Sequence, residues 1–465
     1  MYRFRRRAVL PILPIDTGRY GTPEMRRIFD EENRLQKMLE VEAALAWAHG
    51  EVGDIPKRDA EKIVERASTK HVKLSRVKEI EREIKHDVMA LVRALAEVCG
   101  PSGAYVHLGA TSSDILDTAT ALQLKEALNL IEKRLNDLER VLIRRAEQYK
   151  KTMMMGRTHG QHALPITLGF KFAVWMREAA RHLQRLQECR DRLIVGKMSG
   201  AVGTQAGFGP HALKIQEFVM KRLGVKPAEI STQILQRDRY AEFICVLAIV
   251  ASTLDKIATE IRELQRPEIG EVFEPFERER QVGSSTMPHK RNPMVCERVC
   301  GLARIVRSLG APSLENVPTW HERDLTQSSA ERFIVPEACI LTDYMLVLVT
   351  KVLTGVQVDE QRMLKNMELT QGRMMSEAVM LALARKGMNR QKAHELVRGL
   401  AIKSDVEKRP FKKILVENGT AHKMLSEREV DEALDPQNYL GTAIKQVELV
   451  IKTTKRERKA RGLPD

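Results

Sequence analysis

Residues 283–294, GSSTMPHKRNPM, gather hydroxyls, cations and an amide in one short segment between two helical runs. A serine is a poor base at neutral pH unless nearby positive charge in a dry site stabilises its alkoxide. Lys290 and Arg291 can supply that charge, and Asn292 can donate a hydrogen bond to an oxyanion. Pro293 can begin a helix, whose N-terminus also favours negative charge. The segment is therefore expected to be a closing loop that removes a proton next to a carboxylate.

A second candidate, GRTHGQHALP at 156–165, places Arg157 and His159 between two glycines. A cation and an imidazole at such a turn suit an anion pocket with a proton donor. His159 and His162 are three residues apart, but no HExxH pattern and no third ligand at metal spacing accompany them. No metal site is therefore expected. A structural role for His159 stays open at this point.

Three further polar segments have residue types that can bind an anion. LGATSSDILD at 108–117 has hydroxyls that either cap a helix or, with the helix N–H groups, bind a carboxylate. STQILQRDRYAE at 231–242 is either a charged helix start or part of a polar lining. WHERDLTQSSAER at 320–332 has arginines that can clamp a phosphate or carboxylate, although such a stretch is also typical of solvated surface. The residues of interest are Thr111, Ser112, Gln233, Arg323, Ser328 and Arg332.

The elements that carry these segments are predicted to be long helices. Apolar residues recur at steps of three and four, and alternation of period two is nearly absent. Helices with such stripes must pack side by side as an elongated bundle. The clearest seams are Leu124, Leu128, Ile131, Leu135, Leu138 and Leu142; Leu247, Val250, Leu254, Ile257, Ile261 and Leu264; and Met176, Ala179, Leu183 and Leu186.

The chain is therefore predicted to be all-α, with three helical domains at about 1–110, 111–358 and 359–465. Its 465 residues exceed what one simple core needs. The middle domain is expected to be the bundle of long helices. A glycine-rich connector at 196–210 interrupts it, and this is not a phosphate loop because no GK[ST] follows.

Composition narrows the possible partners. The net charge is +15 and aromatic residues make up 5%. Basic residues are mixed with glutamates and few aromatics can stack on bases, so an acidic small substrate is favoured over nucleic acid. No run of about 18 uncharged apolar residues indicates a membrane span, and the N-terminus lacks a complete secretory signal. Six cysteines without a CxxC pair fit free thiols in a reducing cytoplasm.

The polar segments together resemble a known family. GSSTMPHKRNP resembles the signature loop of the fumarase/aspartase superfamily. GRTHGQHA, STQILQRDR, ENVPTWHERD and SSAER resemble the adenylosuccinate lyase family in particular, as do RYGTPEM at 19–25 and KHDVMALVRAL at 85–95. The similarity covers the chain apart from about fifteen N-terminal residues. It implies an all-helical homotetramer with a tetrameric helical core, which eliminates fumarate without a metal or other cofactor.

The resemblance also implies roles for single residues. His159 matches the general acid that protonates the leaving nitrogen, and Ser284 matches the base that takes the Cβ proton. The neighbouring Ser285 would bind substrate, and an exchange of roles between the two serines stays open. Each site is shared between three subunits, so the segments need not meet within one chain. The other matches, all expected to bind substrate, are Arg19, Tyr20, Lys85, His86, Asp87, Thr111, Ser112, Gln233, Lys290, Arg291, Asn292, Arg323, Ser328 and Arg332.

The implied reaction is elimination of fumarate from adenylosuccinate to give AMP, and from succinylaminoimidazole carboxamide ribotide (SAICAR) to give AICAR. The expected partners are acidic nucleotide substrates and other copies of the chain, in the cytoplasm, with no nucleic acid and no membrane. A related carboxymuconate cycloisomerase is the alternative, although that reaction needs no histidine that protonates a nitrogen. An RNA-binding or scaffold protein would leave the ordered polar segments unexplained.

Overall fold

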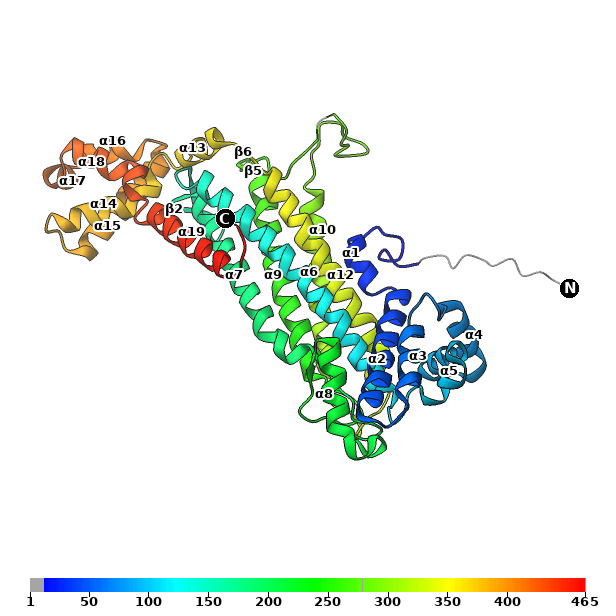
Figure 1. The fold of residues 1–465 in the computed structure, drawn as a ribbon. Coiled ribbons are helices and arrows are strands. Elements are labelled where there is room, and N and C mark those ends of the chain that lie inside the picture. The colour runs from blue at the N-terminus through cyan, green and yellow to red at the C-terminus, as the bar shows by residue number, and fades with distance from the viewer. Residues whose placement is uncertain (1–11, 278, 465) are drawn as a thin grey trace. The chain divides into compact units, whose positions relative to one another are not determined.

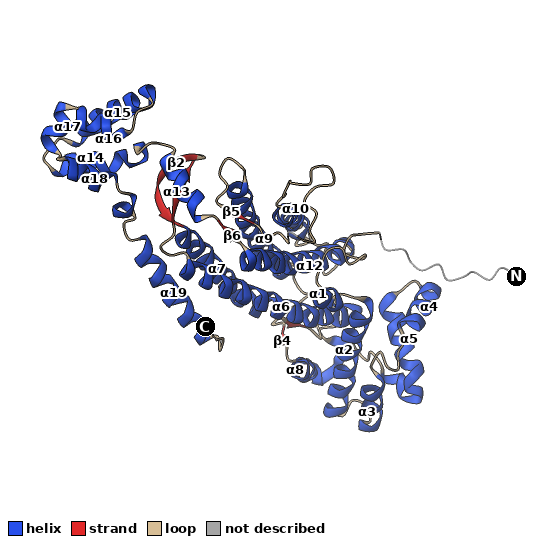
Figure 2. Cartoon of the chain, turned by 90° about the horizontal axis from the view of Figure 1, so that it is seen from above, coloured by secondary structure: helices blue, strands red, loops and turns tan. Residues whose placement is uncertain are grey.

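The computed structural model describes residues 12–277 and 279–464, and nearly all of its regular structure is helical (Figures 1 and 2). The prediction of an all-α chain is confirmed. The described residues form two compact units. The first takes in the described parts of Met1–Asn136, His182–Asp255 and Val299–Leu348, and the second those of Asp137–Arg181, Lys256–Arg298 and Val349–Asp465.

Long helices supply residues to both units, and the predicted apolar seams lie on them. Every residue of the three seams is buried, with at most 2% of its surface exposed. The steps of three and four therefore mark true helix faces that form the core. The long helices are α6 (Ser112–Gln148), α7 (Leu168–Leu193), α9 (Asp238–Gln265), α10 (Met294–Ser308) and α12 (Thr326–Gly355).

The first unit also contains shorter helices whose ends are fixed by side-chain caps. Asp30 caps α2 (Glu31–Val52), since its carboxylate accepts from the backbone N–H of Asn33 at 2.6 Å. His86 caps α5 (Asp87–Cys99) in the same manner. The other elements of this unit are α1 (Pro23–Ile28), α3 (Lys57–Arg66), α4 (Leu74–Ile84), η1 (Gly100–Tyr105), β3 (Val195–Gly196), η2 (Ala206–His211), α8 (Ala212–Leu223), β4 (Lys226–Pro227) and α11 (Gly310–Glu315).

The second unit contains an antiparallel hairpin of β1 (Met153–Thr158) and β2 (Gln161–Thr167), and a short antiparallel pair of β5 (Val272–Phe273) and β6 (Gln357–Val358). Small helices follow, several of which share an apolar core formed by buried side chains between Val379 and Val430. They are α13 (Glu360–Glu368), η3 (Arg373–Met375), α14 (Ser376–Arg385), α15 (Arg390–Glu407), α16 (Phe411–Glu417), α17 (Gly419–Met424), α18 (Glu427–Leu434), η4 (Pro436–Tyr439) and α19 (Ala443–Ala460).

Helix α6 begins near residue 111, and α12 ends near residue 358. The division into three domains at these two points stays a prediction.

All six cysteines are free thiols, and five of them are buried. Helix α12 is the one described helix long and apolar enough to cross a membrane, and 61% of its apolar window is buried inside the structure. A core helix of a soluble protein has the same character, so α12 is weak support for a membrane span.

Candidate active site

A cleft of about 750 Å³ in the first unit is lined by residues from distant parts of the chain. Side chains from the starts of α5, α6 and α12, and from the segments that precede α9 and α12, meet there. Residues that the sequence placed in separate motifs therefore lie together in the structure. Eight of the residues predicted to bind substrate lie in this cleft: Lys85, His86, Asp87, Ser112, Gln233, Arg323, Ser328 and Arg332.

The N-terminus of α5 forms one side of the cleft. Lys85 ends α4 in a left-handed conformation with φ 58°, which turns the chain directly into α5. Asp87 lies in the first turn of α5, where the helix dipole favours a carboxylate. Its Oδ2 accepts a hydrogen bond from Arg332 Nη2 at 2.9 Å. This ion pair joins α5 to α12 at the cleft.

Gln233 joins two other parts of the cleft. Its Oε1 accepts from Arg323 Nη1 at 3.1 Å, and its Nε2 donates to Thr111 Oγ1 at 3.5 Å. The backbone N–H of Thr111 donates to Asp114 Oδ2 at 2.8 Å. Asp114 also accepts from Lys197 at 2.5 Å, and neither side chain of that pair is exposed. A buried ion pair therefore holds the start of α6 beside the cleft.

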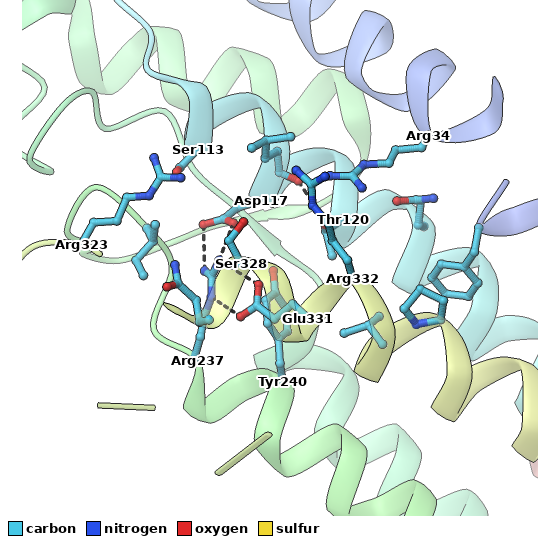
Figure 3. A pocket seen from close by; sticks show the side chains of 17 residues that line it. Arg34, Ser113, Asp117, Thr120, Arg237, Tyr240, Arg323, Ser328, Glu331 and Arg332 are labelled. Carbon is cyan, nitrogen blue, oxygen red and sulfur yellow. Dashed lines mark hydrogen bonds and ion pairs between the residues drawn. The ribbon is translucent and has the colours of Figure 1, made fainter. Parts of the chain in front are cut away.

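A smaller cavity of about 150 Å³ shares Leu116 with the cleft, and also the predicted residues Arg323, Ser328 and Arg332 (Figure 3). Arg237 within it is bound by two carboxylates. It donates to both oxygens of Asp117 at 3.0 Å and, through Nε, to Glu331 at 2.7 Å. Burial raises the pKa of Glu331, against the opposing effect of Arg237. Arg237 is thus neutralised by its neighbours and serves the structure of the cavity wall.

The same cavity contains cationic and polar groups that are not neutralised. Burial, and then the charge of Arg332, lower the pKa of Arg34. Neither Arg34 nor Arg323 forms a salt bridge within residues 12–277 and 279–464, and the Asp87 and Glu31 carboxylates only partly offset the lowered pKa of Arg34. In the same part of the chain, the Tyr240 hydroxyl and Gln327 Oε1 are buried without a hydrogen-bond partner. The cavity therefore suits an anionic group or water. Its residue Arg34 was not predicted, because an arginine on an amphipathic helix is normally a solvated side chain.

Arg19 and Tyr20 lie in the first unit before α1 and line neither cavity. Arg19 is exposed, and its guanidinium carbon lies 6.0 Å from the centre of the Tyr20 ring. The Tyr20 ring lies 6.0 Å from that of Tyr344. The structure therefore places these two predicted residues apart from the cleft.

His159 lies in the second unit, at the tip of the β1–β2 hairpin. His159 and Gly160 form the two-residue turn, with φ 53° and 71°. Both positive values are what tight hairpin turns require, and asparagine or glycine is normally found there. A histidine in this conformation is uncommon and costs free energy, which is frequent at functional sites. The side chain is exposed, so the turn presents the imidazole away from the unit that carries it.

Ser284 lies in the same unit, on the loop between β5 and α10. Its Oγ accepts from the backbone N–H groups of Thr286 at 3.3 Å and Met287 at 3.0 Å. Two donors to the hydroxyl oxygen favour its anionic form. Ser284 is partly buried, whereas Ser285 is exposed and makes no such contact within the described residues. The local geometry thus suits Ser284 better than Ser285 as a base.

The two ends of this loop, near Gly283 and near Asn292, are in close contact. The Asn292 amide donates to the Gly283 carbonyl at 2.9 Å. A Cβ added to Gly283 would lie 2.0 Å from the carbonyl oxygen of Lys290, so only glycine fits. Lys290 and Arg291 are exposed, with the Arg291 guanidinium carbon 5.3 Å from the centre of the Phe276 ring. Both cations are therefore free to approach a ligand.

Where the loop joins α10, a buried carboxylate that sequence analysis did not identify binds the start of the helix. Glu274 is 3% exposed and accepts from the backbone N–H groups of Val295 at 3.2 Å and Cys296 at 3.0 Å. The N-terminus of α10 was expected to favour the negative charge of a substrate. Glu274 supplies negative charge there instead, although it precedes Met294, the first residue of α10, by twenty positions.

Apart from Arg19 and Tyr20, the predicted site residues lie in two groups. One group is at the cleft of the first unit, and the other is in the second unit, on the turn of His159 and the loop of Ser284. No group of three or more His, Cys, Asp or Glu side chains that could hold a metal ion occurs within the described ranges.

Comparison with known proteins defines the class. Residues 18–308 match the family model described as lyase, and residues 372–450 match that of the adenylosuccinate lyase C-terminus. The fold is similar to the crystal structure of a fumarate lyase from a Mesorhizobium species, with a TM-score of 0.87 and 33% identity over 93% of this chain and 98% of the other. A 3-carboxy-cis,cis-muconate lactonizing enzyme from Pseudomonas putida has a TM-score of 0.87 and 36% identity over 96% and 99% of the two chains. The fold is that of the fumarase/aspartase superfamily of lyases.

The particular branch follows from sequence identity. An adenylosuccinate lyase from Pyrococcus abyssi is 55% identical over 454 residues, which are 98% of this chain and the whole of the relative. The chain belongs to the adenylosuccinate lyase family, as its motifs predicted. It is a carbon–nitrogen lyase whose substrates are small nucleotides.

Proposed function

We propose that the chain catalyses elimination of fumarate from adenylosuccinate to give AMP, and from SAICAR to give AICAR. The observation that carries this proposal is the single cleft into which scattered motif residues are gathered. Its arginine, lysine and hydroxyl groups suit a substrate that bears a phosphate and two carboxylates. The adenylosuccinate lyase from Pyrococcus abyssi supports the same assignment through its 55% identity.

In this proposal, elimination uses the loop and the turn of the second unit. Ser284 removes the proton from the carbon next to a substrate carboxylate, and Lys290 and Asn292 stabilise the charge that develops on that carboxylate. The electron pair then forms the double bond of fumarate as the carbon–nitrogen bond breaks. His159 donates a proton to the leaving nitrogen. The proton count balances without a redox or metal cofactor.

The functional protein is proposed to be a cytoplasmic homotetramer whose sites are shared between subunits. The first unit exposes several large apolar side chains, and we infer that some of them are covered by other copies of the chain. Trp320, for example, is 78% exposed. Other examples are Ile249, Ile305, Leu314, Val317, Leu325 and Phe333. No nucleic acid or membrane takes part in this proposal.

The P. putida lactonizing enzyme, at 36% identity, makes a carboxymuconate cycloisomerase the second candidate. Both functions are tested by incubating the purified protein with adenylosuccinate, SAICAR or 3-carboxy-cis,cis-muconate, without added cofactor. We expect fumarate and AMP, or fumarate and AICAR, and no lactone. Turnover of the muconate alone would establish the second candidate in place of the first.

A further inference from the structure

The hairpin that carries His159 is anchored by one buried ion pair. Arg157, two residues before the turn, donates from Nη1 and Nη2 to the two carboxylate oxygens of Glu271 at 2.9 and 2.6 Å. Glu271 is 0% exposed. A bidentate contact of this kind fixes the orientation of the guanidinium as well as its distance from the carboxylate. The strand that leads into the His159 turn is thus tied to a fixed point inside the second unit.

Glu271 is itself fixed by neighbouring segments of the same unit. The Asn366 amide, on α13, donates to Glu271 Oε1 at 2.7 Å and to the Ile269 carbonyl at 2.8 Å. The Glu271 backbone N–H donates to Leu264 at 2.9 Å, and its carbonyl accepts from Asp359 at 3.0 Å. The carboxylate therefore has a defined position relative to α9, β6 and α13.

Within the described residues of its own chain, the His159 side chain has no comparable support. It makes no hydrogen bond within residues 12–277 and 279–464, and it is exposed. Its backbone has a positive φ, which is uncommon for residues other than glycine. The strands beneath the turn set the position of the His159 backbone, from which the imidazole projects. Arg157 is the charged side chain of those strands that binds a buried acid.

We propose that Glu271 is a positioning residue, which acts through Arg157 to hold His159 at the angle needed for proton transfer to the leaving nitrogen. The inference rests on the proposed role of His159 as the general acid. Because His159 acts on the chemical step, Glu271→Gln should lower kcat by about 10- to 100-fold and leave KM nearly unchanged, as displacements of about 1 Å do.

The decisive measurement is kcat for Glu271→Gln, His159→Gln and the double variant. A residue that works only through His159 has no further effect once His159 is lost, so the double variant should be no slower than His159→Gln alone. Arg157→Lys, which keeps the cation but loses the two-pronged contact, should behave in the same manner and serves if Glu271→Gln does not fold. Glu139→Gln is the matched control, since Glu139 is also 0% exposed, binds Arg458 and Arg461, and lies in the same unit. It should leave the kcat of the folded protein unchanged.

A fall in kcat that is just as large in the His159→Gln background, or no fall with either Glu271→Gln or Arg157→Lys, would overturn the positioning role alone. A near-normal kcat for His159→Gln would instead overturn the proposed acid, and the positioning role with it.

Discussion

Ser284→Ala is expected to lower kcat by about 10³-fold or more and to leave the affinity for adenylosuccinate near that of the unchanged protein. The hydroxyl is the proposed base and the alanine cannot accept the proton. The Ser284 side chain contributes little to binding, because its oxygen already accepts two hydrogen bonds from its own loop. The measurements are kcat with adenylosuccinate and the affinity of the inactive variant for the same ligand.

Two variants of the same loop serve as comparisons. Ser285→Ala alters the neighbouring, exposed hydroxyl and should keep much of the activity. Lys290→Ala should weaken both turnover and binding, because a cation that faces a substrate carboxylate stabilises the bound substrate as well as the transition state. If Ser285→Ala is the inactive variant and Ser284→Ala keeps more than about a tenth of its rate, Ser285 is the base.

His159→Gln is expected to lower kcat by about 10²–10⁴-fold, the usual contribution of a general acid. Binding should change less, since glutamine can still donate a hydrogen bond. His162, which pairs with Arg157 across the hairpin, offers a matched control. Burial, and then the charge of Arg157, lower the pKa of His162, so it is a poor proton donor at neutral pH. His162→Gln should therefore keep kcat near normal. A normal rate for His159→Gln would point to His86, in the cleft, as the acid.

Sequence periodicity was sufficient for the long helices but missed the hairpin of the candidate acid. The seam of α6 has the three–four spacing of a buried helix face, and every member is buried. The β1–β2 hairpin has His159-Gly160 at its turn, where Asn-Gly is the usual signal, and its strands show no clear alternation. The proposed acid thus occupies a turn position where an asparagine would have indicated the hairpin.

Only the site residues that belong to a recognisable sequence motif could be predicted from the sequence. Lys85, Gln233 and Arg332 came from separate motifs and meet in one cleft. Glu271 and Glu274 follow no motif, because a glutamate in the segment IGEVFEPF resembles solvated charge. Their burial depends on partners far along the chain, Arg157 and Asn366 for the first and the start of α10 for the second. Such pairings arise from tertiary packing, which residue spacing does not encode.

Complementation between Ser284→Ala and His159→Gln tests most directly whether the two residues act together in sites shared between chains. The variants, each nearly inactive, are unfolded and refolded in an equal mixture, and mass measurement confirms tetramers of the 52.9 kDa chain that contain both. In a site that takes Ser284 from one chain and His159 from another, each of the two residues is intact with a probability of about one half, because the two variants are mixed equally. The mixture should then recover roughly a quarter of normal fumarate release from adenylosuccinate. Mixed tetramers that stay as inactive as the separate variants would contradict the shared site.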